Sequence, residues 1–485
     1  MTFTGQPAHD AARGLLTHAL ALRRAQDMER ARDAATQAAR LDPDDAQIAL
    51  AHAHLSYESW QPAADIFARA AALSPATAAA QLPITRAHAL ALNAEGAGAE
   101  AQALLTTALA RQPDWVEGHR ALATMRQTAG DGAAGAGSDF ARSFASGVAA
   151  LPADAPGQLG VRLAWFHTLA TARRWDVARA VLADARAALG QHRGLTLAEI
   201  FLASESDSAS TDPRLFDGVA DVRDVGLDLC ATRFWLRNGD PARAARIAQA
   251  HVSAAAATTP AARTFWPYLS LCWRMLGDDR QAWLDGAPPL VSAVDLSLSA
   301  ADLSALATTL RGLLTLKSPF AEQSVRGGVQ TDRHLFFNPD PAIQNVRAKL
   351  AAAVAAYVSA LPPPVAAHPL LSPPRHHPIS FEGSWSVLLG AQGFHASHTH
   401  VMGWISSALY VDLPPAPQLG APPAGWLSFG SGPPELGLGL PPLAQIEPKP
   451  GRLALFPSTL WHGTMPFDDG ERLTIAFDVA HPRSG

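Results

Sequence analysis

The stretch GFHASHTHVMGWISSALYVDLP at residues 393–414 decides how the C-terminal third of this chain is interpreted. Its first half holds three histidines within six positions, and its second half has the composition of a β-strand. Side chains alternate along an extended segment, so His398 and His400 should project to one face while His395 points elsewhere. Because the chain contains 18 histidines, the cluster alone does not separate a metal site from chance. The rest of the sequence has to decide.

Length and charge limit the class of protein. The chain has 485 residues, enough for two or more domains with separate cores. Its 38 Lys and Arg against 43 Asp and Glu give a net charge of -5, which offers no general attraction to nucleic acid or to an anionic membrane. The N-terminal stretch lacks a signal-peptide pattern, and no apolar run reaches transmembrane length, so we expect a cytoplasmic protein. Cys230 and Cys272 are the only cysteines and are predicted to be buried core thiols.

The first 315 residues are rich in Ala, Leu and Arg at helical spacing. The stretches ERARDAATQAARLDP and QPAADIFARAAALSP end alike, and their last residues, Pro43 and Pro75, lie 32 residues apart. Pro113 and Pro152 follow at similar intervals. This pattern resembles tetratricopeptide repeats, which are helix pairs that bury their apolar faces by stacking on neighbours. We therefore predict a TPR-like α-solenoid over residues 1–315, with a generic solenoid lacking a peptide groove as the alternative.

After Thr315 the sequence alternates with period two, and its turns are rich in Pro and Gly. The predicted strands are SVRGGVQT, WSVLLG, WISSALYVDLP, WLSFG, GRLALFPS and RLTIAFDVA. One helix interrupts them and begins near Asp340, which can cap it, and Pro341, which suits its first turn. Residues 316–485 are thus predicted to form a compact β-sandwich or barrel, which makes the whole chain a multidomain α + β protein.

A third metal ligand should come from a distant strand, and His462 follows the apolar strand in GRLALFPSTLWHGTMPF. Ten residues later Arg472 begins RLTIAFDVA. One face of that strand carries Leu473, Ile475, Phe477 and Val479, and the other carries Arg472, Thr474, Ala476 and Asp478. An arginine on an inward face needs a partner. A carboxylate held by the Arg472 guanidinium and the Thr474 hydroxyl would supply one.

These motifs in combination resemble the Fe(II)- and 2-oxoglutarate-dependent dioxygenases. The segments GGVQT, GFHASHTHVMGWISSALYVDLP, GRLALFPSTLWHGTMPF and RLTIAFDV are similar to the bacterial oxygenases of this class that follow tetratricopeptide repeats. The resemblance covers about residues 316–482. It implies a double-stranded β-helix, or jelly roll, that uses Fe(II), 2-oxoglutarate and O2. It also implies that His398 and His462 bind the metal and that Arg472 pairs with the distal carboxylate of 2-oxoglutarate.

His400 departs from the commoner pattern, in which the second position of the motif is Asp or Glu. Either His400 completes a three-histidine metal site, which we favour, or it supports the site without binding iron. Two other assignments also have alternatives. Thr474 either contacts the co-substrate or is simply a good strand former. Tyr410 either reaches the co-substrate or is a buried strand tyrosine whose hydroxyl is satisfied elsewhere.

The predicted activity is that of a 2-oxoglutarate-dependent hydroxylase. The alternatives are a three-histidine thiol dioxygenase of the cupin type, a zinc or nickel cupin, and an interaction scaffold with an inactive oxygenase domain. Aspartyl/asparaginyl hydroxylases also join helical repeats to an oxygenase domain, so we expect a peptide or protein substrate bound by the repeats. A small-molecule substrate stays open, as does a homodimer in which the repeats serve only to dimerise the enzyme.

Overall fold

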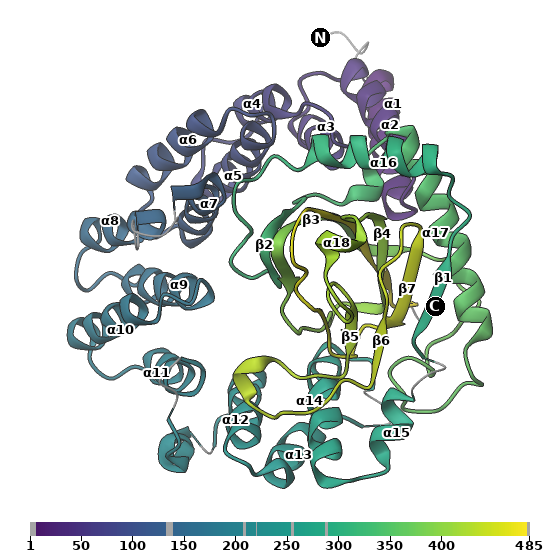
Figure 1. Cartoon of the computed structure of the whole chain (residues 1–485). Helices are drawn as coiled ribbons and strands as arrows, with labels where there is room; N and C mark the ends of the chain where they lie inside the picture. Colours follow the sequence, from purple (N-terminus) through teal and green to yellow (C-terminus); the bar gives the residue numbers. More distant parts are fainter. Residues whose placement is uncertain are drawn as a thin grey trace. The chain divides into compact units, whose positions relative to one another are not determined.

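The computed structural model of the chain describes residues 6–131, 139–206, 210–219, 221–253, 257–286 and 290–482 (Figure 1). The chain divides into two compact units. The first unit comprises residues 1–195 with 336–339, and the second comprises residues 196–335 with 340–485.

The first unit is helical, as predicted. Its α-helices are α1 (Gln6–Arg24), α2 (Met28–Leu41), α3 (Ala46–Glu58), α4 (Ala64–Leu73), α5 (Ala78–Ala94), α6 (Gly98–Arg111), α7 (Val116–Arg126), α8 (Arg142–Ala150), α9 (Gly157–Thr171) and α10 (Trp175–Leu189). Helices that are consecutive in the chain contact one another, among them α1 with α2 and α3 with α4. Asp27 and Asp45 cap α2 and α3 by accepting hydrogen bonds from backbone amides in the first turn. Fully buried alanines such as Ala31 and Ala35 let neighbouring helices approach closely.

Helices also make up the first part of the second unit. They are α12 (Val225–Arg237), α13 (Pro241–Gln249), α14 (Pro260–Leu276), α15 (Arg280–Asp285) and α16 (Ala300–Leu313), while α11 (Arg193–Glu205) crosses the division between the units. The predicted helix after Pro341 is α17 (Pro341–Ala360), and Asp340 caps it through the amide of Ala342. The short α18 (Ala416–Leu419) lies between strands. Among the described residues, no helix has the length and apolar character needed to cross a membrane.

Two antiparallel sheets form the β-region of the second unit. The strands are β1 (Ser292–Asp295), β2 (Val325–Gln330), β3 (Phe381–His395), β4 (Gly403–Asp412), β5 (Leu427–Phe429), β6 (Ala444–Ile446), β7 (Arg452–Pro457), β8 (His462–Thr464) and β9 (Arg472–Ala480). The larger sheet has the order β1-β7-β4-β9-β3-β2, and the smaller one has the order β6-β5-β8. All six predicted strands are present, and the jelly-roll prediction is confirmed. The short strands β1, β6 and β8 were not predicted.

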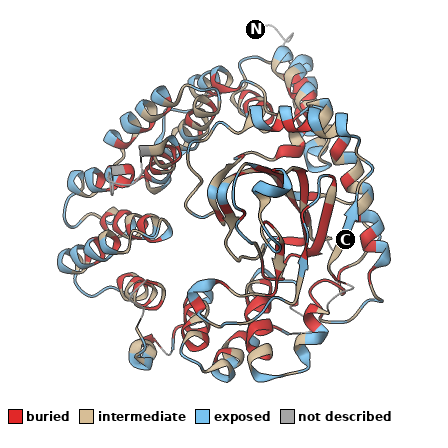
Figure 2. Ribbon diagram, viewed as in Figure 1, coloured by how far each residue is buried: buried red, intermediate tan, exposed pale blue. Residues whose placement is uncertain are grey.

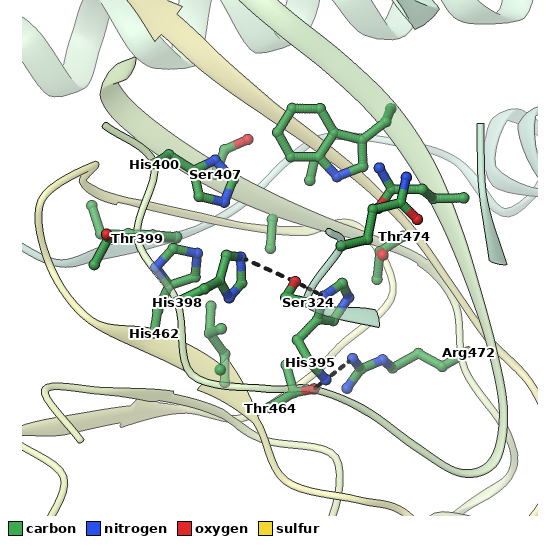
Figure 3. Close-up of a pocket in the computed structure, with 18 of the residues that line it drawn as sticks. Ser324, His395, His398, Thr399, His400, Ser407, His462, Thr464, Arg472 and Thr474 are labelled. Atoms are coloured by element: carbon green, nitrogen blue, oxygen red, sulfur yellow. Dashed lines mark hydrogen bonds between the residues drawn. The ribbon is translucent and has the colours of Figure 1, made fainter. Parts of the chain in front are cut away.

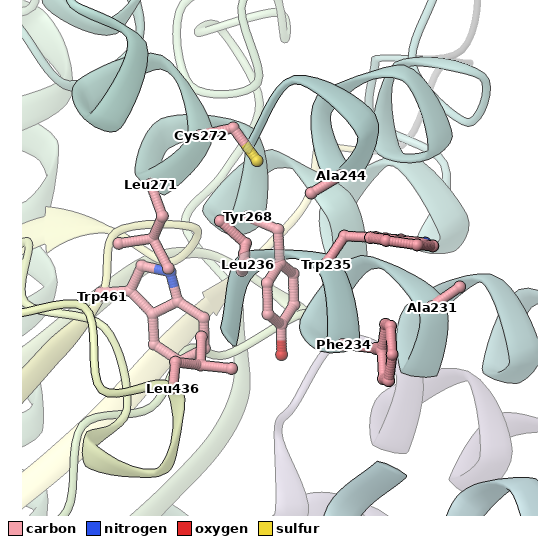
Figure 4. Close-up of a cluster of buried hydrophobic side chains, with 10 residues drawn as sticks. All are labelled: Ala231, Phe234, Trp235, Leu236, Ala244, Tyr268, Leu271, Cys272, Leu436 and Trp461. Atoms are coloured by element: carbon pink, nitrogen blue, oxygen red, sulfur yellow. The ribbon is translucent and has the colours of Figure 1, made fainter. Parts of the chain in front are cut away.

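The helices α12 to α14 share a hydrophobic core with the β-region (Figure 4). Leu271 and Tyr268 of α14 belong to the same buried cluster as Leu436 and Trp461, which come from loops between strands. The indole nitrogen of Trp461 donates a hydrogen bond to the carbonyl oxygen of Pro267 at 2.9 Å. Within this unit the β-region is therefore continuous with helices that the sequence placed before residue 316, so the division between compact units does not coincide with the predicted domain boundary.

Buried residues lie on the central strands of the larger sheet, and the helices carry both buried and exposed residues (Figure 2). Both cysteines are buried and unpaired, as predicted. Burial raises the pKa of Cys230 to about 11 and that of Cys272 to about 12, so both are neutral thiols at physiological pH.

His368 makes the stability of the second unit depend on pH. Its Nδ1 accepts hydrogen bonds from the amides of Leu370 and Leu371, and its Nε2 donates one to the carbonyl of Leu284, so only the neutral ring fits. Burial lowers its pKa to about 4, as it does for His334 and His481. Below pH 6.5 the unfolded chain binds protons that the folded chain does not, so the stability present above pH 6.5 is lost progressively as the pH falls towards 4.

From this shift we expect His368 alone to reduce the free energy of unfolding by about 2 kcal/mol between pH 7 and pH 5. Urea unfolding of the protein and of His368→Asn at both pH values measures the effect. The variant should be less stable at pH 7 and should lose less stability on acidification. Equal losses in the two proteins would contradict the assignment.

Candidate metal and co-substrate site

Three histidines meet where the two sheets adjoin. His398 follows β3, and His462 is the first residue of β8. The two residues form a β-bridge in which each backbone amide donates to the carbonyl of the other, at 2.9 and 3.0 Å. The amide of His400 donates to the carbonyl of Ser458, just after β7. Backbone pairing therefore fixes the positions from which the three side chains project.

The three imidazole rings converge, as Figure 3 shows. Their centroids are 4.2 Å apart for His398 and His462, 4.9 Å for His398 and His400, and 5.1 Å for His400 and His462. One nitrogen of each ring lies within 4.8 Å of the corresponding nitrogens of the other two, so the group could hold a metal ion.

The outer nitrogens of the three rings are already engaged. Nδ1 of His398 donates to the carbonyl of Ala396 at 2.8 Å, and Nδ1 of His462 donates to that of Leu460 at 3.0 Å. Nδ1 of His400 donates to a carboxylate oxygen of Asp478 at 2.7 Å. With the proton held on Nδ1, the lone pair of each ring is on Nε2, which is the atom left to bind a metal.

Burial keeps His398 and His462 neutral. It lowers the pKa of His398 to about 3 and holds the pKa of His462 well below 6.5, with the neighbouring histidines adding to the shift. Neutral imidazole is the form that binds metals, and a group of three histidines suits iron, zinc, copper or nickel better than calcium or magnesium.

Arg472 lies in the same pocket as the histidines, and its side chain is 1% exposed. It donates to the carbonyl of Gly425 at 2.9 Å and to the Thr464 hydroxyl at 3.1 Å. Two buried polar atoms here have no hydrogen-bond partner, namely Nε of Arg472 and the hydroxyl of Tyr410. The guanidinium carbon lies 5.9 Å from the centre of the Tyr410 ring. An anionic ligand with oxygen acceptors would satisfy both orphaned groups, so the residues present fit 2-oxoglutarate.

The pocket has a volume of about 250 Å³, and its wall includes the three histidines, Arg472, Tyr410 and Thr474. All six residues that were singled out from the sequence therefore face one cavity. A second pocket of about 430 Å³ adjoins it and shares Glu322, Gln323, Gln330 and Trp385 with it. The additional space lies beside the ring of Trp385, which stacks on His400 with centroids 5.4 Å apart.

His395 does not point away from the cluster, contrary to expectation. It lies at the end of β3 and lines the pocket, with its ring centroid 6.0 Å from that of His398. The hydroxyl of Ser324 lies 3.0 Å from Nδ1 of His395 and 3.3 Å from Nε2 of His398. The expectation was wrong because residues 396–400 are not a regular strand, so strict alternation does not continue from β4 back to His395.

Three further pocket or supporting residues were not identified from the sequence. Ser324 and Thr464 reach the pocket through strand pairing between distant segments, and a lone hydroxyl residue gives no sequence signal. Asp478 was placed on the correct face of its strand but was given no role. The alternation of side chains along β9 puts Asp478 on the same face as Arg472 and Thr474, and this is the sequence signal that could have indicated its contact with His400.

Comparisons with known proteins give a matching family model and several solved structures that resemble parts of the chain. Residues 383–478 match the family model described as "Putative 2OG-Fe(II) oxygenase". The solved structures that resemble parts of the chain include a Pseudomonas putida prolyl-4-hydroxylase (19% identity, 41% of this chain and 96% of that chain, TM-score 0.27). HygX from Streptomyces hygroscopicus, solved with nickel, 2-oxoglutarate and hygromycin B, is another (12% identity, 39% of this chain and 82% of that chain, TM-score 0.26). YrrB, a TPR protein with an unusual peptide-binding site, is a third (16% identity, 38% of this chain and 90% of that chain, TM-score 0.23).

No curated protein is significantly similar to the chain. The family is named for Fe(II) and 2-oxoglutarate, the cofactors predicted from the sequence. The match extends from β3 to β9 and includes all three converging histidines together with Arg472. Residues 383–478 of this chain are therefore similar to the 2OG-Fe(II) oxygenases, and a region of consecutive, mutually packed helices precedes them.

Proposed function

We propose that the chain is an active Fe(II)- and 2-oxoglutarate-dependent hydroxylase whose substrate is a polypeptide recruited by the helical repeats. His398, His400 and His462 bind the iron through Nε2. Arg472, assisted by Tyr410 and Thr474, binds the distal carboxylate of 2-oxoglutarate. The observation that supports this proposal best is the convergence of three imidazoles with a buried, incompletely satisfied arginine in one pocket.

When bound, iron and 2-oxoglutarate supply the oxidising chemistry: O2 and 2-oxoglutarate are consumed, one oxygen atom enters a substrate C–H bond, and succinate and CO2 leave. The chain's own residues supply position and surroundings. The Nδ1 hydrogen bonds hold the rings in the tautomer that presents Nε2 inward. Trp385 and Phe456 line the pocket with apolar surface, which limits the access of water.

The buried arginine favours this function over the cupin alternatives. A three-histidine thiol dioxygenase needs no cation aimed at a dicarboxylic acid, whereas Arg472 and Tyr410 each offer an unsatisfied buried donor. An inactive scaffold would have no need to keep these groups buried at a cost of about 1–3 kcal/mol for each unsatisfied atom. The intact triad also supports an active enzyme over a scaffold.

A polypeptide substrate is proposed because stacked helix pairs form extended surfaces suited to peptides, and this chain devotes most of its first 195 residues to them. The 430 Å³ pocket beside the iron site offers space for a side chain of such a substrate. Small metabolites need neither an extended surface nor a separate helical unit.

The test has two stages. Full-length protein loaded with Fe(II) under anaerobic conditions should form succinate from 2-oxoglutarate once O2 is admitted. A peptide array followed by mass spectrometry then identifies sequences that gain one oxygen atom. Iron-loaded protein that forms no succinate with or without peptides would contradict the oxygenase assignment.

Residues 196–485 test the role of the repeats. This fragment keeps α14 with Trp461 and β1 with β7, whereas a fragment beginning at 316 would expose that core and leave an edge of the sheet unpaired. We expect the longer fragment to bind Fe(II) as the full chain does and to form succinate slowly, but to lose most of its efficiency on the peptide. Undiminished efficiency on that peptide would mean that the repeats do not recruit the substrate.

A further inference from the structure

The three converging histidines differ in what their Nδ1 atoms contact. His398 and His462 donate to neutral carbonyl groups two residues earlier in the chain. His400 alone donates to a carboxylate, at 2.7 Å from Oδ2 of Asp478. It is also the histidine at the position where the commoner metal motif has Asp or Glu.

Asp478 is held firmly in the middle of the larger sheet. It lies opposite Ser406 in the pairing of β4 with β9, and the Ser406 hydroxyl donates to its Oδ1 at 2.6 Å. The backbone of Gly403 passes so close that a Cβ there would lie 3.0 Å from the Cβ of Asp478 and 2.6 Å from the Ser458 hydroxyl. The hydrogen bond from Ser406 and the close approach of Gly403 restrict the Asp478 side chain, and its Oδ2 is directed at Nδ1 of His400.

The charge of Asp478 has no conventional partner. Asp478 is 7% exposed, and in the described part of the chain His400 is the only basic side chain within ion-pair distance of its carboxylate, with no lysine or arginine beside it. A buried carboxylate without a cation is costly. A divalent ion on the far side of the His400 ring would balance this charge through the imidazole.

On the basis of the proposed iron site, we infer that Asp478 is a positioning residue that returns to the metal, through His400, the negative charge that a carboxylate at position 400 would have supplied directly. A carboxylate that accepts the Nδ1 proton makes Nε2 a stronger donor and fixes the ring. The site thus retains two histidines, one carboxylate and their total charge, with an imidazole inserted between the carboxylate and the ion.

The first experiment measures Fe(II) affinity of the full-length protein by anaerobic calorimetry, without 2-oxoglutarate and independently of turnover. Asp478→Asn keeps the shape and an oxygen acceptor but removes the charge. We expect its dissociation constant for Fe(II) to rise about 10- to 100-fold, with little change in the melting temperature of the metal-free protein. Ser406→Ala, which removes a hydrogen bond to Asp478 and keeps the charge, is the matched control and should change the constant less than about threefold.

The second experiment moves the carboxylate. In His400→Asp the metal receives its charge directly, and Asp478 becomes a second buried carboxylate next to the first. Adding Asp478→Asn in this background should strengthen Fe(II) binding. The effect of this substitution on Fe(II) affinity therefore has opposite signs in the two backgrounds. A residue that merely supports the fold would weaken both backgrounds alike. Should Asp478→Asn fail to fold, Asp478→Ser removes the charge without introducing a buried amide.

The outcomes separate the two proposals. If the unmodified protein does not bind Fe(II), the proposed function fails. If it binds Fe(II) but Asp478→Asn binds equally well, or if the substitution acts with the same sign in both backgrounds, the role of Asp478 is overturned and the proposed function stands. Weaker Fe(II) binding by Asp478→Asn alone, together with stronger Fe(II) binding when it is added to His400→Asp, supports the inference.

Discussion

The single substitutions His398→Ala, His400→Ala and His462→Ala should each weaken Fe(II) binding by about two orders of magnitude and abolish 2-oxoglutarate turnover. Each removes one of three imidazoles whose nitrogens lie within 4.8 Å of one another. A ligand in a protein metal site contributes roughly 3 kcal/mol, which corresponds to about a hundredfold in affinity. Anaerobic calorimetry and succinate formation measure the two effects separately.

His376→Ala is the control for these substitutions, since His376 is exposed and lies outside the converging group. It should leave iron binding and turnover unchanged. The decisive variant is His400→Ala. Near-normal iron affinity in that variant would show that His400 supports the site without binding the metal, and the three-histidine arrangement would be wrong.

Arg472→Leu should raise the dissociation constant for 2-oxoglutarate by about one to two orders of magnitude, while Fe(II) binding persists. The guanidinium is buried and would form charge-assisted hydrogen bonds, worth roughly 1.5–3 kcal/mol, with the distal carboxylate. Leucine offers no donor to that carboxylate. Titration of the iron-loaded protein with 2-oxoglutarate gives the constant, and calorimetry with Fe(II) tests whether the metal site is intact.

Arg472 also holds Gly425 and Thr464 by hydrogen bonds, so its loss has a structural component. Tyr410→Phe provides the matched comparison because it removes a hydroxyl that has no partner. It should weaken 2-oxoglutarate binding severalfold without destabilising the metal-free protein. If Arg472→Leu left the 2-oxoglutarate requirement unchanged, the main reason for preferring this family over a cupin would disappear.

Local patterns were enough to predict the parts of the site that lie on regular strands. The alternation in RLTIAFDVA placed Arg472 and Thr474 on the face that lines the pocket, and the observed β9 has that arrangement. The spacing of His398 and His400 predicted their convergence, and Asp340 with Pro341 marked the start of α17. Each of these features depends on neighbours within a few residues.

The remaining features depend on contacts between distant segments. Ser324 reaches His398 because β2 pairs with β3, and no periodicity near residue 324 records that pairing. The three-residue strands β6 and β8 are too short for alternation to be recognised. The helices after residue 195 belong to the second unit because α14 packs against Trp461. The hydrogen bond between Trp461 and Pro267 of α14 joins residues that are 194 positions apart.

The place of β9 in the larger sheet has a consequence for how the chain acquires its site during synthesis. In the order β1-β7-β4-β9-β3-β2, β9 is the only one of the described strands that lies between β4 and β3, although it follows all of them in sequence. Until residue 480 has left the ribosome, the growing chain can hold β1-β7-β4 and β3-β2 only as separate ribbons with exposed edges. Arg472 and Asp478 both lie on β9, the strand that joins these two ribbons. Closure of the larger sheet and arrival of Arg472 at the pocket are thus a single late event.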